Sequence, residues 1–265
     1  MRLLGWVFPL FLMAQALRLA TTTSVYDSGL LDRLLPPFQK ATGVRVEVLA
    51  VGTGQALRLA ERGDVDAVLV HAPELEGEAL RRGYLAEGFC LAANTFLLVG
   101  PPADPARVRE TKGVLEAFRR IALAKALFVS RGDRSGTHLK ELSLWKQAGV
   151  EPAPPWYLES GAGMGQTLVL ASEKGAYTLS DLATYLAVGR KGGLEALYQR
   201  EDPLLLNQYS YYPVSRSPKL EEARRLLGFL ASEEAAARVA SLRVEGVSLF
   251  RPLRGRCILP VGGGR

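Results

Sequence analysis

The sequence predicts an α/β protein with two lobes, each built on a mostly parallel sheet flanked by helices. Three observations lead to this expectation. Short apolar runs alternate with stretches whose apolar residues recur every three or four positions, as strands alternating with helices do. Turns rich in Gly, Ser and Thr follow several of the apolar runs. The chain has 265 residues, 48% of them hydrophobic, which is enough for two modest cores.

The first unit of the chain has a β-α-β-α-β order. The expected strands are Leu17–Thr21, Val44–Val51, Val65–Val70 and Phe96–Val99. A helix that stops at Gly43 comes before the second strand, and its apolar face consists of Leu30, Leu31, Leu34, Leu35 and Phe38. Another helix is expected over Ala56–Arg62. This order predicts parallel strands with helices on both faces of the sheet.

A second unit repeats the scheme. Its expected elements are helix Val114–Lys125, strand Ala126–Val129, helix Leu139–Ala148, strand Trp156–Leu158, a helix from Gln166, strand Tyr177–Leu179 and a helix from Asp181. The apolar runs Leu204–Leu206 and Tyr209–Tyr212 then return the chain to the first unit, where helices are expected at Leu220–Leu230 and Glu233–Leu242. We therefore expect lobe 1 to comprise 17–100 and 206–265, and lobe 2 to comprise 101–205.

Charge and cysteine usage narrow the function classes. The formal net charge of +6 suits an anionic ligand, but basic residues are scattered among acids, which argues against nucleic-acid binding. Cys90 and Cys257 have no metal-ligand spacing with His71 and His138, so no metal site is expected. The spacing leaves open whether the two cysteines form a disulfide.

The N-terminus has the pattern of a secretory signal peptide over residues 1–16. Arg2 supplies the positive start, Leu3–Met13 forms a short apolar core, and Ala14-Gln15-Ala16 fits a cleavage site. A retained membrane anchor is the alternative, but the apolar core is short for a membrane span. We expect export to the periplasm or another extracytoplasmic space.

The segment Ser130–His138 is the most informative turn. It follows a strand-like run and precedes a helix, so its backbone N–H groups face outwards at the positive end of a helix dipole, where an anion is stabilised. Arg131 adds a planar fork of donors that matches the edge of an oxyanion. Ser135 and Thr137 add hydroxyl groups to the turn.

Three other polar turns follow expected strands, namely Thr22-Thr23-Ser24, Gly52-Thr53-Gly54 and Gly161–Gly165. In open parallel sheets, ligands bind beyond the carboxyl ends of the strands, so turns from two facing lobes can converge on one ion. Each turn alone has a structural explanation, since Ser, Thr and Gly commonly cap helices. The repetition of such turns favours a cleft for a small oxyanion.

These residues resemble the tungstate-binding (TupA-like) proteins of bacterial ABC transporters. The similarity runs from about Leu19 to Leu230 and rests on these segments in order: Thr21–Ser24 with Asp27–Leu31, Val51–Ala56, Leu69–Glu74, Ser130–Asp133 with Ser135–His138, Gly163–Gly165, Lys174–Leu179 and Leu206-Asn207. The resemblance implies the two-lobed type II periplasmic-binding-protein fold. It also implies an exported monomer that captures tungstate or molybdate without a cofactor and delivers it to a permease and its ATPase.

Residue by residue, the resemblance implies that the oxyanion pairs with Arg131. The other oxyanion-binding residues that it implies are Thr22, Thr23, Ser24, Thr53, Gly54, Ser135, Gly136 and Thr137. The sequence departs from the family pattern at Asn94, where an Asp is expected, and at Leu182-Ala183, where Arg-Gly is expected. The tail 251–265 has no counterpart in the pattern.

Two alternatives stay open at this point. The pattern around Arg131 also resembles phosphate-binding proteins of the same transporter class. Tungstate and molybdate accept hydrogen bonds only, whereas phosphate keeps a proton near neutral pH and benefits from a carboxylate acceptor. The first turn has no adjacent acid, which favours tungstate, but Asp133 lies close to Arg131 in sequence. The other alternative is an exported phosphoryl-transfer hydrolase, for which the chain lacks a nucleophile elbow and a metal-ligand cluster.

Overall fold

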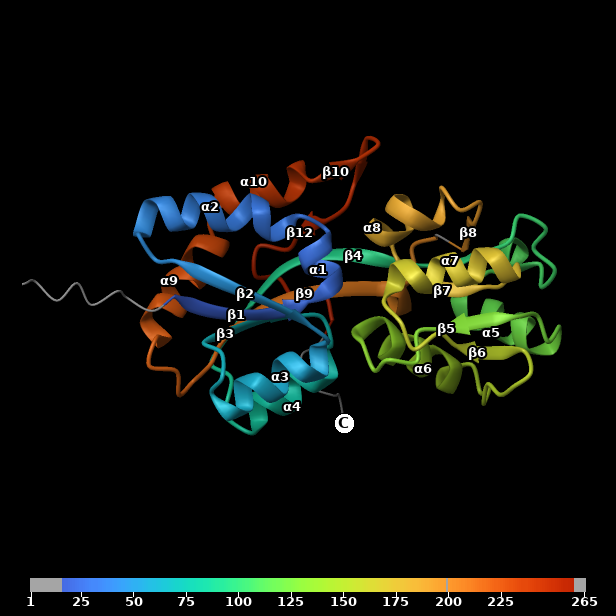
Figure 1. Ribbon diagram of the computed structural model, residues 1–265, viewed down its shortest axis with the longest axis horizontal. Coiled ribbons are helices and arrows are strands. Elements are labelled where there is room, and N and C mark those ends of the chain that lie inside the picture. The colour runs from blue at the N-terminus through green and yellow to red at the C-terminus, as the bar shows by residue number, and fades with distance from the viewer. Residues whose placement is uncertain (1–15, 199, 260–265) are drawn as a thin grey trace, which may run out of the picture.

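The computed structural model describes residues 16–198 and 200–259. The predicted signal peptide, apart from Ala16, therefore lies outside the described residues. Figure 1 shows two lobes side by side, each with helices packed around strands. Within the described ranges, no helix combines the length and the apolar character that crossing a membrane would require.

The first lobe contains a sheet whose strand order is β12-β4-β9-β3-β1-β2. Strand β1 (Leu17–Thr22) pairs in parallel with β2 (Val46–Val51) and with β3 (Ala67–Val70). The other pairs are antiparallel and join β3 to β9 (Leu206–Pro213), β9 to β4 (Phe89–Gly100), and β4 to β12 (Arg251–Pro252). The parallel pairing predicted for the first three strands is confirmed. The strand expected at Phe96–Val99 is part of β4, which is antiparallel to all its neighbours, so the sheets are mixed and the expectation of mostly parallel sheets is wrong.

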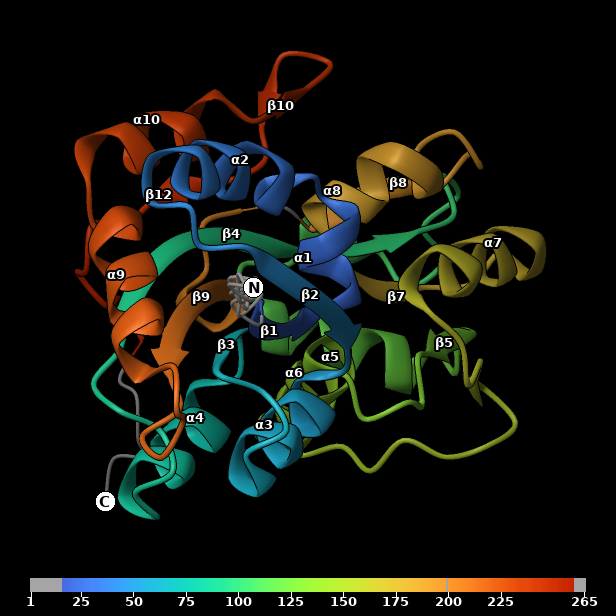
Figure 2. The ribbon, with the colours of Figure 1, turned by 60° about the vertical axis from the view of Figure 1, so that its left-hand side comes forward.

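Helices cover both faces of this sheet. Figures 1 and 2 show α2 (Leu30–Thr42) and α10 (Glu233–Ser241) on one face and α3 (Thr53–Arg62) and α4 (Pro73–Arg81) on the other. The short helix α1 (Thr23–Asp27) precedes α2, and α9 (Leu220–Leu230) lies beside β9. Along β3 the side chains alternate between the two cores: Leu69 packs with the α2 cluster, whereas Val68 and Val70 pack with the α3 cluster.

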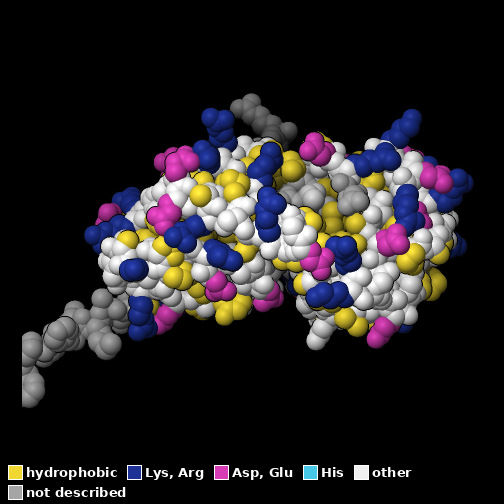
Figure 3. All heavy atoms as spheres, turned by 90° about the horizontal axis from the view of Figure 1, so that it is seen from above, with side chains coloured by type: hydrophobic (Ala, Val, Ile, Leu, Met, Phe, Trp, Pro, Cys, Tyr) yellow, Lys and Arg dark blue, Asp and Glu magenta, His cyan; other side chains and the backbone are white. Residues whose placement is uncertain are grey.

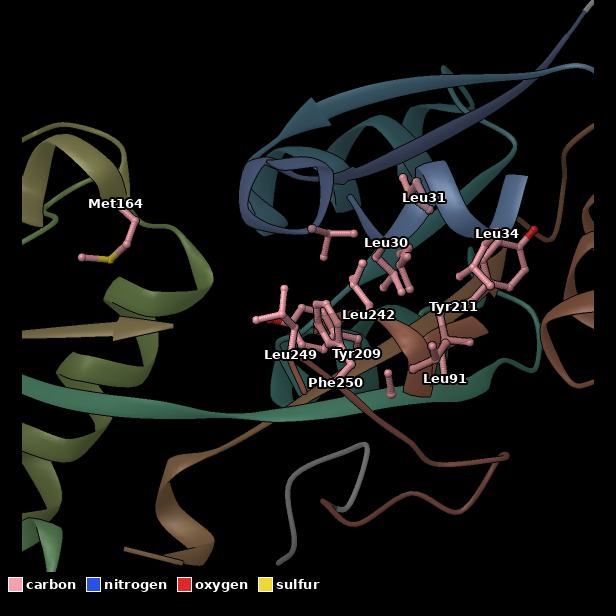
Figure 4. Packing of buried hydrophobic residues seen from close by; sticks show 14 of the residues in the cluster. Leu30, Leu31, Leu34, Leu91, Met164, Tyr209, Tyr211, Leu242, Leu249 and Phe250 are labelled. Carbon is pink, nitrogen blue, oxygen red and sulfur yellow. The ribbon is translucent and has the colours of Figure 1, made fainter. Parts of the chain in front are cut away.

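The larger core cluster fills the space between α2, α10 and the crossing strand β9, and it continues to α7 (Met164–Lys174) and η2 (Tyr185–Gly189) of the second lobe. Figure 4 shows Leu30, Leu31 and Leu34 of α2 close to Tyr209 and Tyr211 of β9. Leu249 and Phe250 from the C-terminal part join the same group, and the ring of Phe250 packs edge-on against that of Tyr209 at 5.3 Å between centroids. Leu17 and Leu19 of β1 and Leu69 of β3 join the same cluster, so apolar packing holds α2 against this face of the sheet.

The second lobe is built around the far half of β4. Strands β7 (Thr178–Asp181) and β8 (Glu195–Tyr198) pair with it in antiparallel fashion, and β5 (Phe128–Ser130) pairs in parallel with β6 (Tyr157–Glu159). Its helical elements are η1 (Val108–Glu110), α5 (Val114–Leu123), α6 (Gly136–Gln147), α7 (Met164–Lys174), α8 (Leu182–Thr184), η2 (Tyr185–Gly189) and η3 (Pro203–Leu205). An aromatic group around Trp145 and Phe128 fills the core below β5.

Two strands cross between the lobes. The first half of β4 pairs with β9, and its residues from Phe96 onwards pair with β7. Thr95 of β4 lies opposite Leu206 at the start of β9, so the chain leaves and re-enters the first lobe through adjacent strands. The return of the chain to the first lobe through β9 agrees with the sequence prediction. The lobe bounds 17–100 with 206–265 and 101–205 stay a prediction.

The C-terminal segment is fastened to these crossing strands. A disulfide joins Cys90 of β4 to Cys257, with 5.3 Å between the Cα atoms, which settles the pairing that the sequence left open. The side-chain oxygen of Gln208 in β9 accepts hydrogen bonds from the backbone N–H groups of Ile258 and Leu259. The hairpin of β10 (Arg243–Val244) and β11 (Val247–Ser248) precedes this segment.

Several elements differ from the sequence-based expectation. Strand β4 begins at Phe89 instead of Phe96, because its first half is buried between β9 and β12 despite its small and polar residues. Helix α4 was not expected, since Gly77 interrupts its pattern. The helix expected from Asp181 shrinks to the three-residue α8 followed by the single π-helical turn η2.

Candidate functional site

The first two polar turns lie next to each other in the first lobe. In the parallel register of β1 and β2, Thr22 lies opposite Val51, so the helices that follow the two strands begin side by side. Thr22 is the N-cap of α1, and its hydroxyl oxygen accepts a hydrogen bond from Val25 N at 3.3 Å. The hydroxyl of Ser24 lies 3.2 Å from that of Thr22, whereas the side chain of Thr23 is exposed.

At the second turn, α3 begins three residues earlier than the sequence suggested. Gly52 is the N-cap, and Thr53 and Gly54 are the first residues of the helix, so their N–H groups lack intrahelical partners. Thr53 is fully buried, and its hydroxyl has no hydrogen-bond partner within the described part of the chain. A buried hydroxyl without a partner is rare in native proteins and commonly marks the place of a ligand or a water molecule.

The Arg131 turn follows β5 in the second lobe. Ser135 is the N-cap of α6 and accepts a hydrogen bond from His138 N at 3.3 Å. Gly136 and Thr137, the first two helical residues, are buried. The helix therefore begins three residues before Leu139, and the predicted donors form its first turn.

Arg131 itself is buried, with 6% of its surface exposed. Its Nη2 atom lies 2.5 Å from Oδ2 of Asp133, but its Nε atom has no partner among the described residues. The positive charge of Arg131 contributes to lowering the pKa of His71, which belongs to the first lobe. It also acts on Asp181, at the end of β7. Arg131 therefore lies where the two lobes and the crossing strands meet.

A hydrogen-bonded group behind this turn supports it. Ser130 Oγ donates to Oε2 of Glu141 at 2.7 Å and accepts from Gly132 N at 3.3 Å. The other carboxylate oxygen of Glu141 accepts from Trp145 Nε1 at 3.0 Å and from the Tyr157 hydroxyl at 2.8 Å. Burial raises the pKa of Glu141 to about 7 although these three donors oppose the shift.

The two carboxylates near Arg131, those of Asp133 and Asp181, already accept hydrogen bonds from groups of the protein. Burial works to raise the pKa of Asp133, but hydrogen bonds from Ser135 and the charge of Arg131 outweigh it, so the pKa falls below its usual value. The two oxygens of Asp181 accept from the backbone N–H and the hydroxyl of Thr184, at 2.9 and 2.7 Å. Burial raises the pKa of Asp181. Both carboxylates thus act mainly as acceptors for the protein's own donors.

His71 connects the two lobes. It follows β3, and its Nδ1 atom lies 2.9 Å from Oδ1 of Asn207 on the crossing strand β9. Burial lowers the pKa of His71 to about 4, so the ring is neutral near pH 7. On the other side of the ring lies Gly136, since a Cβ atom placed there would be only 2.4 Å from Cε1 of His71.

The lobes leave two cavities near their junction. One of about 250 Å³ lies between α3 and α4 of the first lobe and the Arg134–Leu139 region of the second. The other, of about 650 Å³, lies beside the crossing strands between Leu182, the 200–206 segment and Ser248–Arg251. Figure 3, which shows the molecule from above, has a hollow between the lobes and charged side chains of both signs scattered around it. No group of His, Cys, Asp and Glu in the described ranges is arranged to hold a metal ion.

Strand pairing thus brings together Thr22, Thr53 and Gly54 in one lobe, and the first turn of α6 brings together Arg131, Ser135, Gly136 and Thr137 in the other. Sequence reasoning did not find His71, Asn207, Asp181 or Glu141. The His71–Asn207 pair joins residues 136 positions apart and the Glu141–Tyr157 pair joins residues 16 positions apart, so no local pattern predicted these contacts. His138 has its Nδ1 occupied by Arg134 N, while its buried Nε2 lacks a partner among the described residues.

Comparison with known proteins shows the family of the chain. A model of the PBP superfamily domain matches residues 14–234, most of the chain. The tungstate-binding protein TupA of Peptoclostridium acidaminophilum is 40% identical over 242 residues, covering 88% of this chain and 84% of the relative. The chain belongs to the family of TupA-like periplasmic binding proteins.

Solved structures of TupA-like proteins share the fold. The tungstate-binding protein TupA from Desulfovibrio alaskensis G20 superposes with a TM-score of 0.77 at 40% identity, covering 90% of this chain and 99% of that one. The structure described as the tungstate ABC transporter from Geobacter sulfurreducens gives a TM-score of 0.74 at 44% identity, covering 84% and 97%. The two-lobed type II periplasmic-binding-protein fold expected from the sequence is therefore confirmed.

Proposed function

We propose that this chain captures a tetrahedral oxyanion, tungstate or the closely similar molybdate, between its two lobes and delivers it to an ABC importer. The observation that carries the proposal is the buried guanidinium of Arg131, whose Nε atom has no partner in the described structure and whose charge reaches groups of both lobes. Asp133 pairs with Nη2 only, and a buried donor without a partner is costly, so Nε is available to a bound anion. Membership in the TupA-like family supports tungstate as that anion.

The remaining donors come from three helix starts. Thr22, Thr23 and Ser24 at α1 and Thr53 and Gly54 at α3 would bind the ion from the first lobe. Each exposed helix start contributes roughly 0.3–1 kcal/mol to holding an anion, and more in a closed site with little water.

From the second lobe, the donors besides Arg131 are Ser135, Gly136 and Thr137 at the start of α6. The buried, unpartnered hydroxyl of Thr53 is the counterpart on the opposite lobe. Because the two sets belong to different lobes, the ion would bridge them, and closure of the lobes 17–100 with 206–265 and 101–205 would complete the site.

The state of the acids supports an ion that carries no proton. Asp133 already accepts hydrogen bonds from Arg131 and Ser135, and Asp181 accepts two from Thr184. Phosphate needs a free acceptor for its proton near pH 7, whereas tungstate and molybdate need donors alone. This arrangement favours tungstate over the phosphate alternative, although Asp133 lies close to Arg131.

The cellular setting follows from the same proposal. The relatives compared above are binding and transport proteins by name, and we propose no catalytic step for this chain. We propose that it acts as an exported monomer in the periplasm or another extracytoplasmic space, with a permease and its ATPase as partners. The Cys90–Cys257 disulfide supports an oxidising compartment.

Calorimetric titration tests the proposal directly. The purified chain without residues 1–16 is titrated separately with tungstate, molybdate, sulfate and phosphate in metal-free buffer. We expect tight binding of tungstate or molybdate, weaker binding of sulfate, and a rise in melting temperature with each ion that binds. Binding of phosphate in preference to tungstate would move the assignment to the phosphate-binding class, and hydrolysis of phosphate esters would point to an enzyme.

A further inference from the structure

The contact between His71 and Gly136 joins the two lobes. His71 belongs to the loop after β3, and Gly136 is the first residue of α6. A Cβ atom at position 136 would lie 2.4, 2.8 and 2.9 Å from Cε1, Nε2 and Nδ1 of the imidazole ring. Carbon atoms do not approach a ring so closely, so only glycine allows the observed spacing of the lobes.

The imidazole ring cannot easily move aside. Its Nδ1 atom donates a hydrogen bond to Asn207 Oδ1 at 2.9 Å, and Asn207 Nδ2 in turn donates to the hydroxyl of Tyr209 at 2.6 Å. The rings of Tyr209 and Phe96 lie beside it, with centroids 5.0 and 6.5 Å away. Asn207 and Tyr209 belong to β9, which pairs with β3 and β4 in the sheet of the first lobe, so these two partners hold the ring relative to that lobe.

The other side of the contact is equally fixed. Gly136 is held in the backbone of α6, whose N-cap Ser135 bonds His138 N and whose backbone bonds continue from Leu139 N to Ser135 O at 2.9 Å. Gly136 is also part of the turn that we assign to the oxyanion. The distance between this turn and the donors of the first lobe therefore depends on how closely Gly136 approaches His71.

We propose that His71 and Gly136 form the mechanical stop of lobe closure and thereby set the size of the oxyanion that the closed site accepts. This inference rests on the proposed function of the same cleft. If the lobes closed further, the site would suit a smaller ion such as sulfate, because the protein groups that donate hydrogen bonds to a smaller ion must lie nearer to one another. Two lobes held further apart would leave donors out of hydrogen-bond range of any tetrahedral ion.

Substitutions on the two sides of the stop have opposite effects. In Gly136→Ala the added methyl group meets a ring that is held in place. The lobes must therefore move apart to make room for it. In His71→Ala the ring is gone and the lobes can approach further. The double variant His71→Ala/Gly136→Ala exchanges the ring for a methyl group, so the two changes compensate.

The experiment combines titration with small-angle X-ray scattering on the wild-type chain and these three variants. The matched control is Gly113→Ala, since Gly113 is the N-cap of α5 in the second lobe and a Cβ there meets nothing within 4 Å. With tungstate bound, Gly136→Ala should have a larger radius of gyration than wild type and bind at least about tenfold more weakly. Gly113→Ala should match wild type in both.

Two further outcomes decide the inference. His71→Ala should raise the affinity for sulfate relative to tungstate, and the double variant should recover most of the tungstate affinity that Gly136→Ala loses. A merely structural defect would not be repaired by a second substitution. Unchanged compaction and affinity in Gly136→Ala, while wild type binds tungstate, would overturn the stop and leave the proposed function intact. Failure of wild type to bind any of the tested oxyanions would overturn both.

Discussion

Ser130 donates a hydrogen bond of 2.7 Å to the buried carboxylate of Glu141, and the same hydroxyl accepts from the backbone of the Arg131 turn. An acid in the core of the second lobe is thus linked to the turn that we assign to the oxyanion. Burial raises the pKa of Glu141 to about 7, well above its ordinary value of 4.5. The ionisation of this group is therefore coupled to folding.

The ionisation of Glu141 should be detectable in the pH dependence of stability. Because its pKa is higher in the folded chain than in the unfolded one, its stabilising contribution is complete below about pH 4.5 and is lost as the pH rises through about 7. Gln cannot ionise, so the melting temperature of Glu141→Gln relative to wild type should rise between about pH 5 and about pH 8. Thermal melts across this range measure the difference.

The control for this prediction is Glu151→Gln, which changes an exposed glutamate of the same lobe. Its melting temperature should stay at a constant offset from wild type over the same range. A constant offset for Glu141→Gln as well would contradict the assignment of the raised pKa to this carboxyl.

Thr53 should show opposite effects on stability and on binding. Its hydroxyl is buried without a partner in the described structure, so Thr53→Val, which keeps the shape, removes an unsatisfied polar group. We expect the free energy of unfolding without ligand to stay equal or rise by about 1 kcal/mol, while tungstate affinity falls about tenfold. Chemical denaturation and calorimetry check the two halves.

Thr21→Val provides the matched control for Thr53. Thr21 is equally buried, but its hydroxyl donates to Leu69 O at 2.8 Å. Its replacement should destabilise the fold by roughly 1–3 kcal/mol, because Leu69 O loses its side-chain donor. Equal destabilisation by both substitutions would mean that the Thr53 hydroxyl has a partner in solution.

Arg131 and Arg134 should differ strongly although they lie in one turn. Arg131 is buried beside Asp133, whereas Arg134 is exposed. Arg131→Ala should reduce the free energy of oxyanion binding by roughly 2–5 kcal/mol, since a bound ion would lose its buried countercharge. Arg134→Ala should cost about 1 kcal/mol or less, as exposed charges usually do. Similar losses in two folded variants, measured by titration, would refute the role of Arg131.

Reduction of the Cys90–Cys257 disulfide should lower stability. The bond closes a loop across 167 positions and holds the C-terminal segment against β4. Removing such a crosslink typically costs about 2–4 kcal/mol, so the melting temperature should drop when a reductant is added. The variant Cys90→Ala/Cys257→Ala should melt at the lower temperature with and without reductant. A reductant effect on that variant would show that the drop has another cause.

The alternation of strands and helices could be predicted because each element carries its own local pattern. The apolar face of α2 and the stop at Gly43 suffice to place that helix, and the αL conformation of Gly43 bears this out. The first half of β4 gave no such signal, since Asn94 and Thr95 are polar and the strand is stabilised by pairing with β9 and β12. Pairing with neighbouring strands, and not the local strand preference of its residues, makes this segment a strand.

The candidate site divides in the same way. The turns at Thr22, Thr53 and Ser135 were visible because capping residues at helix starts are local features. The position of His71 between Asn207 and Gly136 could not be predicted, because both partners are distant from it in sequence. The role of glycine at position 136 appears only when the opposite lobe is in place.

The chain passes from β4 into the second lobe and back through β9, and this connectivity bears on the order in which the two lobes fold. The core cluster of the second lobe draws all its buried residues from between Phe96 and Leu205, so one continuous stretch of chain can collapse by itself. In the first lobe, β3 gains its second neighbour only when β9 is available. We expect the second lobe to become protected first during refolding, and pulsed hydrogen exchange would reveal the reverse order if β1 and β3 were protected earlier.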